Sequence, residues 1–458
     1  MLESAHQAAA HTVDVIVVGA GVAGLAAAHH MNSAGLSVTV LEAAPAVGGR
    51  MATDKVDGFR LDRTAPLLST SYPELARVPA LDALALRPFS AALLLHTDGR
   101  LHRADATPAL PRSRRGALTA VRALASAPRI PRAQGAPRAS RPGPLGTLAD
   151  QSRLATALAR LAATPPEQLL ARPELPTSEA LVSRGFPARA VDGFLRPLLT
   201  ALLADPELRT SSRCADLALH SFATGRLCLP EGGADALPEF LAATLPPGSV
   251  RTGVRVTSIS TTSVATADHG ELRCRAVLLA TGARAAAQLL PGLRVPAFHP
   301  VTVLHHATDE PPLTEPALVL DADRVGPVSH TAVISQVDPS RAPAGRALIS
   351  STVLGTPPDP AHLDATVRSQ LARLYGTSTN RWELLAVHHD AEAVPTMPPP
   401  HDLRRPVRLL AGLYVCGDHR DTSTVQGALR SARRAAHAVL TDLDVQPTLV
   451  AEPLETAA

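Results

Sequence analysis

The segment at residues 13–42 constrains the fold of this 458-residue chain more than any other stretch. It begins with VDVIVV at 13–18, a continuous apolar and β-branched run that is typical of a strand buried on both faces of a parallel sheet. After a glycine-rich turn, VAGLAAAHHMNSAG at 22–35 favours a helix and LSVTVLE at 36–42 favours a second strand. This order predicts a βαβ unit and an α/β fold.

Three glycines in the turn, Gly19, Gly21 and Gly24, have the spacing that binds a dinucleotide. The first glycine permits the tight turn, the second lets the backbone approach a pyrophosphate, and the third lets the helix pack closely on the strand. Free N–H groups at the helix N-terminus then stabilise the pyrophosphate. Glu42 ends the second strand, where its carboxylate accepts hydrogen bonds from a ribose diol and repels a 2′-phosphate. The segment predicts a dinucleotide site that disfavours NADP.

Composition argues against several other classes of protein. A formal charge of +3 is close to balance, so a nucleic-acid-binding protein with a pervasive basic face is not expected. Four widely spaced cysteines without a C-x-x-C pair suggest reduced cytoplasmic thiols. We find no secretory signal and no apolar run of about 20 residues that would span a bilayer, so we expect a cytoplasmic protein with at most peripheral membrane contact.

The middle of the chain changes character twice. Residues 103–146 carry nine arginines, seven prolines and one acid, which favours a solvated excursion, with a basic lid or membrane-touching surface as the alternative. Helical periodicity follows over 147–204. Five strands are expected after residue 295, at 300–307, 316–321, 330–337, 346–354 and 382–389, with a helix at 360–376.

The stretch after Glu42 contains Gly48, Gly49 and Arg50 within GGRMAT. This resembles the G-G-R-x-x-T motif of the flavoprotein superfamily that includes monoamine oxidases, protoporphyrinogen oxidases and phytoene desaturases. The resemblance implies that the dinucleotide is FAD and that Arg50 lies over its pyrophosphate as a fixed positive charge.

Two segments further along the chain resemble the same superfamily. AVLLATGA at 276–283 is similar to the strand beside the cofactor, which implies that Thr281 and Gly282 contribute to the FAD site. VRTGVRVTSI at 250–259 is similar to the strand whose backbone, at Val256, holds the adenine. CLPEGGADALPEFLAATLP at 228–246 is similar to the glycine-rich lead into the preceding helix.

The most specific resemblance is C-terminal, in GLYVCGDHRDTSTVQGALRSARRAAHAVL at 412–440. It implies that a buried strand ends at Gly417 and that Asp418 bonds a ribityl hydroxyl. The amides that open the last helix, those of Gln426, Gly427 and Ala428, would face flavin N1 and O2. This segment, with residues 194–222, looks especially like a group of actinobacterial FAD-dependent oxidoreductases of unassigned substrate.

The fold that these segments imply is a Rossmann-like, two-dinucleotide FAD-binding domain with an inserted α+β substrate domain. The FAD-binding domain is expected in three parts. Its parts are 11–90, 223–292 and 401–445. The substrate domain is expected to have a helical part at 91–222, which contains the 103–146 excursion, and a sheet part at 293–400. A flexible tail is expected at 446–458.

Two residues near the implied flavin are candidates for catalysis. Arg63 and Thr64 stand where family members usually have glycine, so Arg63 either turns into the substrate cavity as an electrostatic or catalytic group or crowds the flavin. His419 follows Asp418 and is either an acid or base near neutral pH or a locally bonded loop residue. His305, His306 and the pair at 388–389 lack ligand partners at suitable spacing, so no metal site is predicted.

The expected activity is FAD-dependent removal of hydride from a small apolar organic substrate, in the manner of an oxidase or dehydrogenase. Only one glycine fingerprint is present, so oxygen or another diffusible acceptor is expected to reoxidise the flavin. Amine oxidation is less favoured because Lys55 is the only lysine and tyrosines are scarce. The alternatives are a redox-neutral flavin-dependent isomerase and a non-catalytic protein that holds a prenyl or lipid-like ligand. Oligomeric state is left open.

Overall fold

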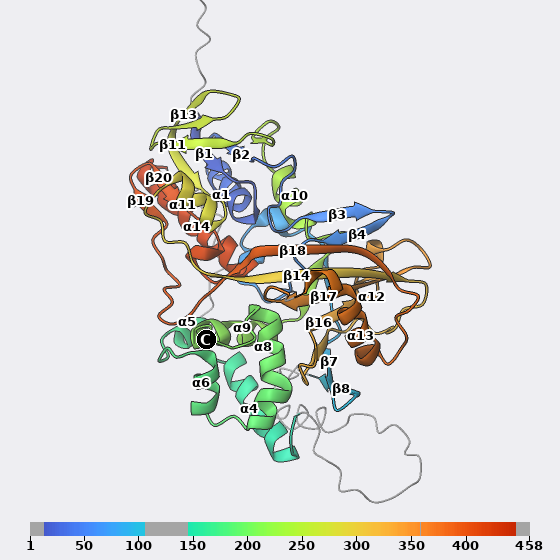
Figure 1. Ribbon diagram of the computed structural model, residues 1–458. Helices are drawn as coiled ribbons and strands as arrows, with labels where there is room; N and C mark the ends of the chain where they lie inside the picture. The colour runs from blue at the N-terminus through green and yellow to red at the C-terminus, as the bar shows by residue number, and fades with distance from the viewer. Residues whose placement is uncertain (1–12, 106–144, 358, 446–458) are drawn as a thin grey trace, which may run out of the picture.

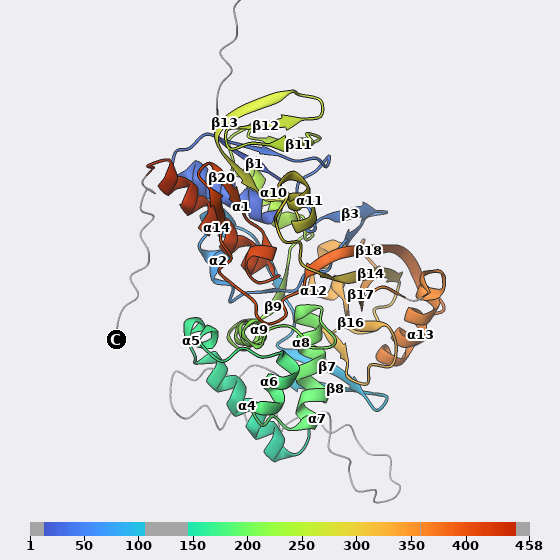
Figure 2. The ribbon, with the colours of Figure 1, turned by 60° about the vertical axis from the view of Figure 1, so that its left-hand side comes forward.

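The computed structural model describes residues 13–105, 145–357 and 359–445 (Figure 1). Most of the predicted basic excursion and the whole predicted tail at 446–458 lie outside these residues. The described chain is mixed α/β, as predicted, and its two large sheets have eight and seven strands. In Figures 1 and 2 the eight-stranded sheet forms the upper lobe, while the seven-stranded sheet lies below it beside a group of helices.

The eight-stranded sheet contains the predicted βαβ unit. Strand β1 (Val13–Val18) has the predicted bounds and lies between two parallel partners, β2 (Val38–Leu41) and β13 (Glu271–Leu279). The sheet is completed by β10 (Val250–Arg251), β11 (Val256–Ile259), β12 (Ser263–Thr266), β19 (Arg408–Leu410) and β20 (Leu413–Val415). Segments from both ends and the middle of the chain therefore build one sheet.

Helices cover this sheet because its central strands are apolar on both faces. On one face, α1 (Val22–Ser33) packs against α14 (Val425–Asp442) and α10 (Ala236–Ala243) in a single apolar core. On the other, the antiparallel strands β11 to β13 and helix α11 (Ala283–Leu289) cover a second apolar cluster. The carboxyl ends of β1, β2, β13 and β20 thus lie at one edge, where ligands bind in such folds.

The seven-stranded sheet has the strand order β18-β14-β17-β16-β15-β7-β8. Strand β7 precedes the excursion and β8 extends into its first residues, so the sheet of the substrate domain also draws on the segment that was expected to be helical. The bounds are β7 (Ala92–Thr97), β8 (Arg100–Asp105), β14 (Phe298–Thr308), β15 (Val319–Asp321), β16 (Val328–Val333), β17 (Ala347–Leu354) and β18 (Glu383–Pro395).

Both faces of this second sheet are also covered. Helix α13 (Leu363–Tyr375), preceded by η4 (Pro360–His362), packs with Trp382 against one face. The helical region packs on the other face in the largest apolar core (Figure 2). It comprises α4 (Leu148–Ala162), α5 (Pro166–Leu170), α6 (Thr177–Ser183), α7 (Ala188–Ala190), the π-helical η2 (Val191–Leu195), α8 (Arg196–Leu203) and α9 (Ser212–Thr224).

Short elements connect the two lobes. The hairpin of β3 (Thr53–Val56) and β4 (Phe59–Asp62) follows the Arg50 segment. A three-stranded sheet is formed by β5 (Leu68–Ser69), β6 (Leu86–Pro88) and β9 (Leu227–Pro230). The remaining pieces are α2 (Pro73–Ala76), η1 (Pro79–Leu81), α12 (Ile334–Val337), η3 (Pro339–Arg341) and η5 (Asp418–Arg420).

Two local predictions need correction. The apolar run 330–337 is not one strand, because β16 ends at Val333 and the next four residues form the helical turn α12. The segment 250–259 is two strands, β10 and β11, separated by a turn in which Gly253 has φ +72°. Hydrophobicity alone does not distinguish a buried helical turn from a short strand.

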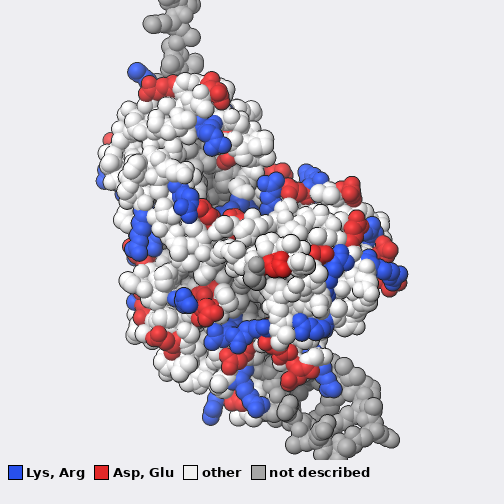
Figure 3. Space-filling view, viewed as in Figure 1, with Lys and Arg blue, Asp and Glu red and all other residues white. Residues whose placement is uncertain are grey.

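The surface agrees with a near-neutral charge. Figure 3 shows basic and acidic side chains interspersed over the visible face. In the part of the chain that the structure describes, no helix is both long and apolar enough to cross a membrane. All four cysteines are buried and unbridged.

Candidate cofactor and active site

The three glycines of the first turn have different surroundings. A Cβ at Gly24 would lie 2.0 Å from the Gly19 carbonyl oxygen, and one at Gly19 would lie 3.0 Å from the Ala280 carbonyl, so both are packing positions. A Cβ at Gly21 would have no atom of the protein within 4 Å. Gly21 also caps α1, whose N-terminus has no side-chain cap. The turn therefore presents open backbone and uncapped amides to a ligand, as the spacing predicts.

Glu42 lies beside this turn. Its Oε2 accepts a hydrogen bond from the Ala20 amide and its Oε1 accepts one from the Ala44 amide, both at 2.8 Å. Each carboxylate oxygen retains a lone pair for a ribose hydroxyl. The Val254 amide donates to the Glu42 carbonyl at 2.8 Å, and Val256 begins β11 two residues later. The segment expected to hold the adenine is thus next to the segment expected to hold the ribose.

The end of β13 carries an unsatisfied polar atom. The Thr281 hydroxyl is buried and has no hydrogen-bond partner in the described part of the chain. A Cβ on the next residue, Gly282, would meet no atom within 4 Å. Gly48 forms an isolated β-bridge with Gly21. Gly49 also lies close to Gly21, because a Cβ on Gly49 would be 3.7 Å from the Gly21 Cα. A buried hydroxyl without a partner next to a glycine-lined cradle fits a bound cofactor.

Arg50 and Asp418 link the two ends of the chain. The Arg50 Nη2 donates to Asp418 Oδ1 at 2.7 Å, while Nη1 donates to the Ala393 carbonyl at 2.7 Å. Burial acts to lower the pKa of Arg50, but the charge and hydrogen bond of Asp418, with the charges of Asp390 and Glu392, together raise it. Burial likewise acts to raise the pKa of Asp418, yet the charge and hydrogen bond of Arg50, with contributions from His419, together keep that pKa below its usual range. Both groups are therefore charged at neutral pH.

The N-terminus of α14 is partly capped within the chain. Thr424 accepts hydrogen bonds from the Gly427 amide through its side chain at 3.1 Å and from the Ala428 amide through its carbonyl at 2.9 Å. A Cβ at Gly427 would lie 2.0 Å from the Thr422 carbonyl oxygen, so glycine is required for this packing. Gln426 uses its side-chain carbonyl to accept from the Glu74 amide at 3.1 Å. Two of the three expected flavin-facing amides thus already have partners.

Comparison with known proteins identifies this arrangement. Residues 22–440 match the model of the family described as flavin containing amine oxidoreductase. The chain belongs to this family. The flavoprotein resemblance, the FAD cofactor and the oxidoreductase class are thereby confirmed.

Individual relatives of this flavin-containing oxidoreductase match only short stretches. Protoporphyrinogen oxidase 2 of Arabidopsis thaliana is 45% identical over 73 residues, which is 16% of this chain and 14% of that protein. Solved structures agree over nearly the whole fold. An oxidoreductase from Methanosarcina mazei has a TM-score of 0.68 at 16% identity and covers 93% of this chain and 100% of its own. Cyclohexylamine oxidase from Brevibacterium oxydans has a TM-score of 0.65 at 17% identity and covers 94% of this chain and 100% of its own.

His419 is buried in η5 beside the Arg50–Asp418 pair. A Cβ at Gly417 would lie 2.7 Å from the imidazole, so the ring packs on the glycine backbone. Its Nδ1 is 4.0 Å from Asp418 Oδ1, which is too far for a hydrogen bond. Burial lowers the pKa of His419 to about 4. The imidazole is therefore neutral at neutral pH and titrates well below the range expected from the sequence.

Arg63 lies at the surface of the flavoprotein rather than in a buried cavity. Its Nε and Nη2 donate to the Asp54 carboxylate, with Nη2 to Oδ1 at 2.8 Å, and 58% of its side chain is exposed. The hydrogen bond with Arg63 is the main cause that lowers the pKa of Asp54, and it raises the pKa of Arg63. The backbone of this segment does run along the Arg50 loop, because Thr64 donates to the Arg50 carbonyl at 2.6 Å.

Sequence reasoning missed a buried ionic network next to this segment. Arg341 is 1% exposed and donates to both oxygens of Asp62, at 2.8 and 3.0 Å, and to Asp338 at 3.1 Å. Asp338 also accepts the Gly232 amide at 2.8 Å, and Asp62 accepts the Ala234 amide at 2.9 Å. The network joins β4, η3 and the glycine-rich lead into α10. No local motif announces it, because its members come from three distant segments.

The paired histidines of the second sheet have separate partners. His305 bonds the Asp62 carbonyl at 2.9 Å and the Ser350 hydroxyl at 2.7 Å, whereas His306 bonds Asp364 at 2.8 Å. His388 lies edge-on to His305, with ring centroids 5.6 Å apart. His389 bonds the Thr302 hydroxyl at 2.8 Å.

The lysine and tyrosines also lie in structural positions. Lys55 is exposed on β3. Tyr375 bonds Thr331, Tyr414 donates to Asp442, and burial raises the pKa of Tyr72. Trp382 packs against Tyr375 in the core beneath α13, with ring centroids 6.0 Å apart. None of the contacts described for these side chains involves Arg50 or Asp418.

Proposed function

We propose that this FAD-dependent oxidoreductase oxidises an apolar organic substrate, such as a specialised metabolite, and that oxygen or another diffusible acceptor takes up the electrons. Glu42, Arg50 and the glycine turn would hold FAD, which when bound would supply an acceptor for hydride from a substrate C–H bond. The observation that carries the proposal is the contact of Arg50 with the Ala393 carbonyl. Ala393 belongs to a small apolar cluster with Val301 and Val303, so apolar side chains adjoin a residue of the cofactor site.

The protein's own groups suggest how the reaction is supported. The dipole of α14 and the charge of Arg50 favour negative charge at the cofactor site. His419 is neutral at neutral pH and is the candidate for accepting a substrate proton. Arg63, held by Asp54 at the surface beside the Arg50 loop, is proposed to act as an electrostatic group. It is not proposed as a proton carrier, because an arginine stays protonated.

Amine oxidation is the competing function, since the family contains amine oxidases. The resemblance implies that amine oxidases of this superfamily commonly use a lysine near the flavin and paired aromatic residues for this reaction. Here the only lysine is exposed on β3, and Tyr375, Tyr414 and Trp382 are buried in packing or hydrogen-bonded positions. These positions favour a substrate without an amine.

The test starts from the protein purified without added cofactor. Its visible spectrum is recorded, then re-recorded under anaerobic conditions after mixing with primary amines or with apolar compounds that have an oxidisable C–H bond beside a hydroxyl or double bond. We expect a flavin band that the apolar class bleaches and that returns when air is admitted. Bleaching by amines alone overturns the proposed substrate class. Conversion of substrate to product by the flavin-containing protein without net consumption of an oxidant indicates an isomerase.

A matched pair of variants tests the site itself. Asp418→Asn removes the charge that Arg50 pairs with, so we expect FAD affinity to fall about tenfold or more. Asp442→Asn is the control, because Asp442 pairs with Arg408 away from the glycine turn. Equal flavin content in the two variants would contradict the role of Asp418. A colourless wild-type protein that takes up no added FAD would favour the ligand-holding alternative.

A further inference from the structure

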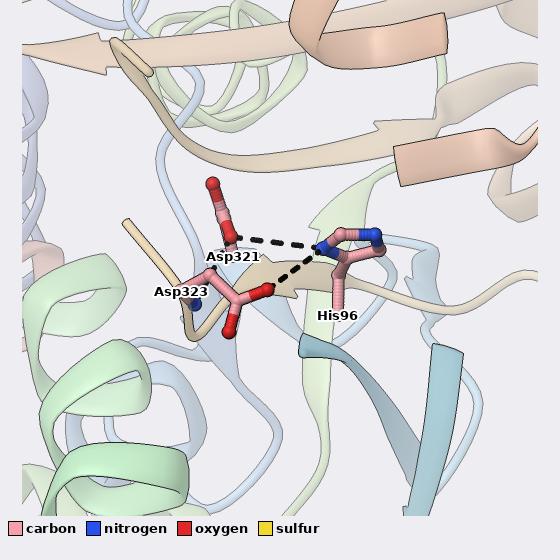
Figure 4. Close-up of side chains that lie close together, drawn as sticks. All are labelled: His96, Asp321 and Asp323. Carbon is pink, nitrogen blue, oxygen red and sulfur yellow. Dashed lines mark hydrogen bonds and ion pairs between the residues drawn. The ribbon is translucent and has the colours of Figure 1, made fainter. Parts of the chain in front are cut away.

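Three side chains converge at the carboxyl ends of β7 and β15, two neighbouring parallel strands of the seven-stranded sheet, in the lobe away from the glycine turn (Figure 4). His96 lies on β7 directly opposite Asp321, the last residue of the parallel strand β15, and Asp323 follows two residues later. The His96 Nδ1 is 3.8 Å from Asp321 Oδ1 and 3.7 Å from Asp323 Oδ2. One ligand atom from each residue lies within 4.8 Å of the others.

His96 is buried without a hydrogen bond. The residue is 7% exposed, and neither ring nitrogen has a hydrogen-bond partner in the part of the chain that the structure describes. Both carboxylate distances exceed the length of a hydrogen bond. A buried imidazole nitrogen without a partner carries a desolvation cost. Figure 4 shows that Nδ1 points between the two carboxylates, where a bound ion would remove that cost.

The remaining oxygens of the two aspartates are held by neighbouring groups. Gln370 donates to Asp321 Oδ2 at 2.7 Å, and Thr97 donates to Asp323 Oδ1 at 2.7 Å. Asp321 Oδ1 also accepts the backbone amides of Asp323 and Arg324, at 3.1 and 3.3 Å, and it faces the histidine together with Asp323 Oδ2. Such outer contacts orient the ligands of metal sites.

We propose that His96, Asp321 and Asp323 bind one divalent transition-metal ion of the zinc class. Ligands about 2.0–2.1 Å from a tetrahedral zinc are separated by about 3.4 Å. The two distances from His96 Nδ1, 3.8 and 3.7 Å, are close to this value, and the three ligand atoms, which lie within 4.8 Å of one another, would contract around the ion. A nitrogen with two carboxylates suits zinc better than magnesium or calcium, which take six or more oxygen ligands or keep several waters. Asp323 has a side chain that is 28% exposed, so water supplies the fourth ligand.

The ion has a structural role in this arrangement. It joins β7 to the end of β15 and the turn that follows it. Strand β7 precedes residues 106–144 in the sequence, whereas β15 follows them. Its ligands belong to a different sheet from the glycine turn. The site therefore stabilises the substrate lobe and does not take part in the redox chemistry.

The experiment uses the FAD-loaded protein after dialysis against a chelator. Zn²⁺ is titrated by calorimetry, and Co²⁺ is titrated by difference absorbance as a probe of ligand geometry. We expect one ion per chain, a higher melting temperature with Zn²⁺ and an unchanged flavin band. Asp323→Asn keeps an oxygen for Thr97 but loses the charged ligand, so its Zn²⁺ affinity should fall about tenfold or more. His96→Gln should abolish tetrahedral Co²⁺ binding.

Asp309→Asn is the matched control, because its side chain is 85% exposed and lies outside the cluster. Its metal affinity should equal that of the wild type. Failure of the wild-type protein to take up either metal overturns the proposal. Equal affinity in the Asp323 and Asp309 variants also overturns it, since the ion would then be bound elsewhere. Asp323 is partly exposed, so its variant is expected to fold even if the His96 variant does not.

Discussion

The nucleotide-binding sheet and the seven-stranded sheet are stabilised in different ways. Around β1 the chain packs through glycine and small apolar residues, as where Gly24 meets the Gly19 carbonyl. Around β14 and β17 the interior also contains buried polar groups, including Arg341 on η3, His305 and His330. The first region depends on close approach of backbone, and the second depends on pairing among buried polar side chains, such as Arg341 with Asp62.

The difference follows from what each region must accommodate. A dinucleotide site needs exposed backbone amides and space, which glycine supplies at the end of a strand. A sheet that joins two lobes can bury charge only where partners satisfy it. The two regions should therefore respond differently to substitution: the first to added volume, the second to lost charge or added protons.

The largest effect is expected from Gly24→Ala. The new Cβ would lie 2.0 Å from the Gly19 carbonyl oxygen and 3.0 Å from the Ala280 Cβ, so the helix must separate from the strand. We expect the free energy of unfolding to fall by about 4 kcal/mol or more. Urea unfolding followed by circular dichroism measures it.

Gly21→Ala is the control for volume at the same turn, because its Cβ would meet no protein atom within 4 Å. It should cost at most about 1 kcal/mol of stability, the effect of alanine at a helix N-cap. FAD affinity should nevertheless fall, since the methyl group occupies the approach to the backbone. Normal FAD affinity in this variant would show that the cofactor does not contact Gly21.

The second largest effect tests the buried network. Arg341→Met leaves Asp62 and Asp338 without their cation, so the free energy of unfolding should fall by about 3–5 kcal/mol. Arg87→Met is the matched control, because Arg87 and Glu231 are 46% and 37% exposed and exposed pairs contribute little to stability. Similar losses in both variants would contradict the distinction between buried and exposed pairs.

The third effect is a dependence of stability on pH. Burial lowers the pKa of His330 and of His305 to about 4, below the ordinary value of 6.5. Between these values the unfolded chain binds protons that the folded chain does not, so stability falls as the pH is lowered from 6.5 toward 4.

His330→Gln removes one of these protons. The free energy of unfolding of this variant should vary less steeply with pH between 4 and 6.5 than that of the wild type. The slope should be smaller by up to about 1.4 kcal/mol per pH unit. Urea titrations at several pH values measure the slope. Above this window the slopes of variant and wild type should agree, which is the internal control. Identical slopes within the window would show that His330 is protonated in the folded state.

The nucleotide-binding half was the more predictable from sequence because its determinants are local. Strand β1 has its predicted bounds, and Gly19, Gly21, Gly24 and Glu42 lie within one βαβ unit, so spacing alone relates them. The C-terminal strand and helix were found from the same kind of pattern, and the structure brings Asp418 to Arg50.

The second half was less predictable because its determinants are distant in the chain. Arg341 and Asp62 are 279 residues apart, and no local pattern relates them. Arg63 was expected at the flavin, but its orientation depends on Asp54, which is opposite Leu61 in the β3–β4 hairpin and so lies diagonally across from Arg63. The alternation of side chains along that hairpin offered a signal for this pair, whereas the Arg341 network offered none.

The smallest effect is expected where the two halves meet, at Lys55 on the β3–β4 hairpin. Lys55 is exposed and lies opposite Arg60 in the strand register, so Lys55→Met should change stability by less than about 0.5 kcal/mol. The rate at which air reoxidises the reduced flavin should also stay the same, because the side chain lies at the surface. Stopped-flow absorbance measures this rate, with Arg60→Met as the control on the facing strand. A slower rate in the lysine variant alone would mean that the hairpin moves to bring its amine to the flavin, and amine oxidation would then become the favoured activity.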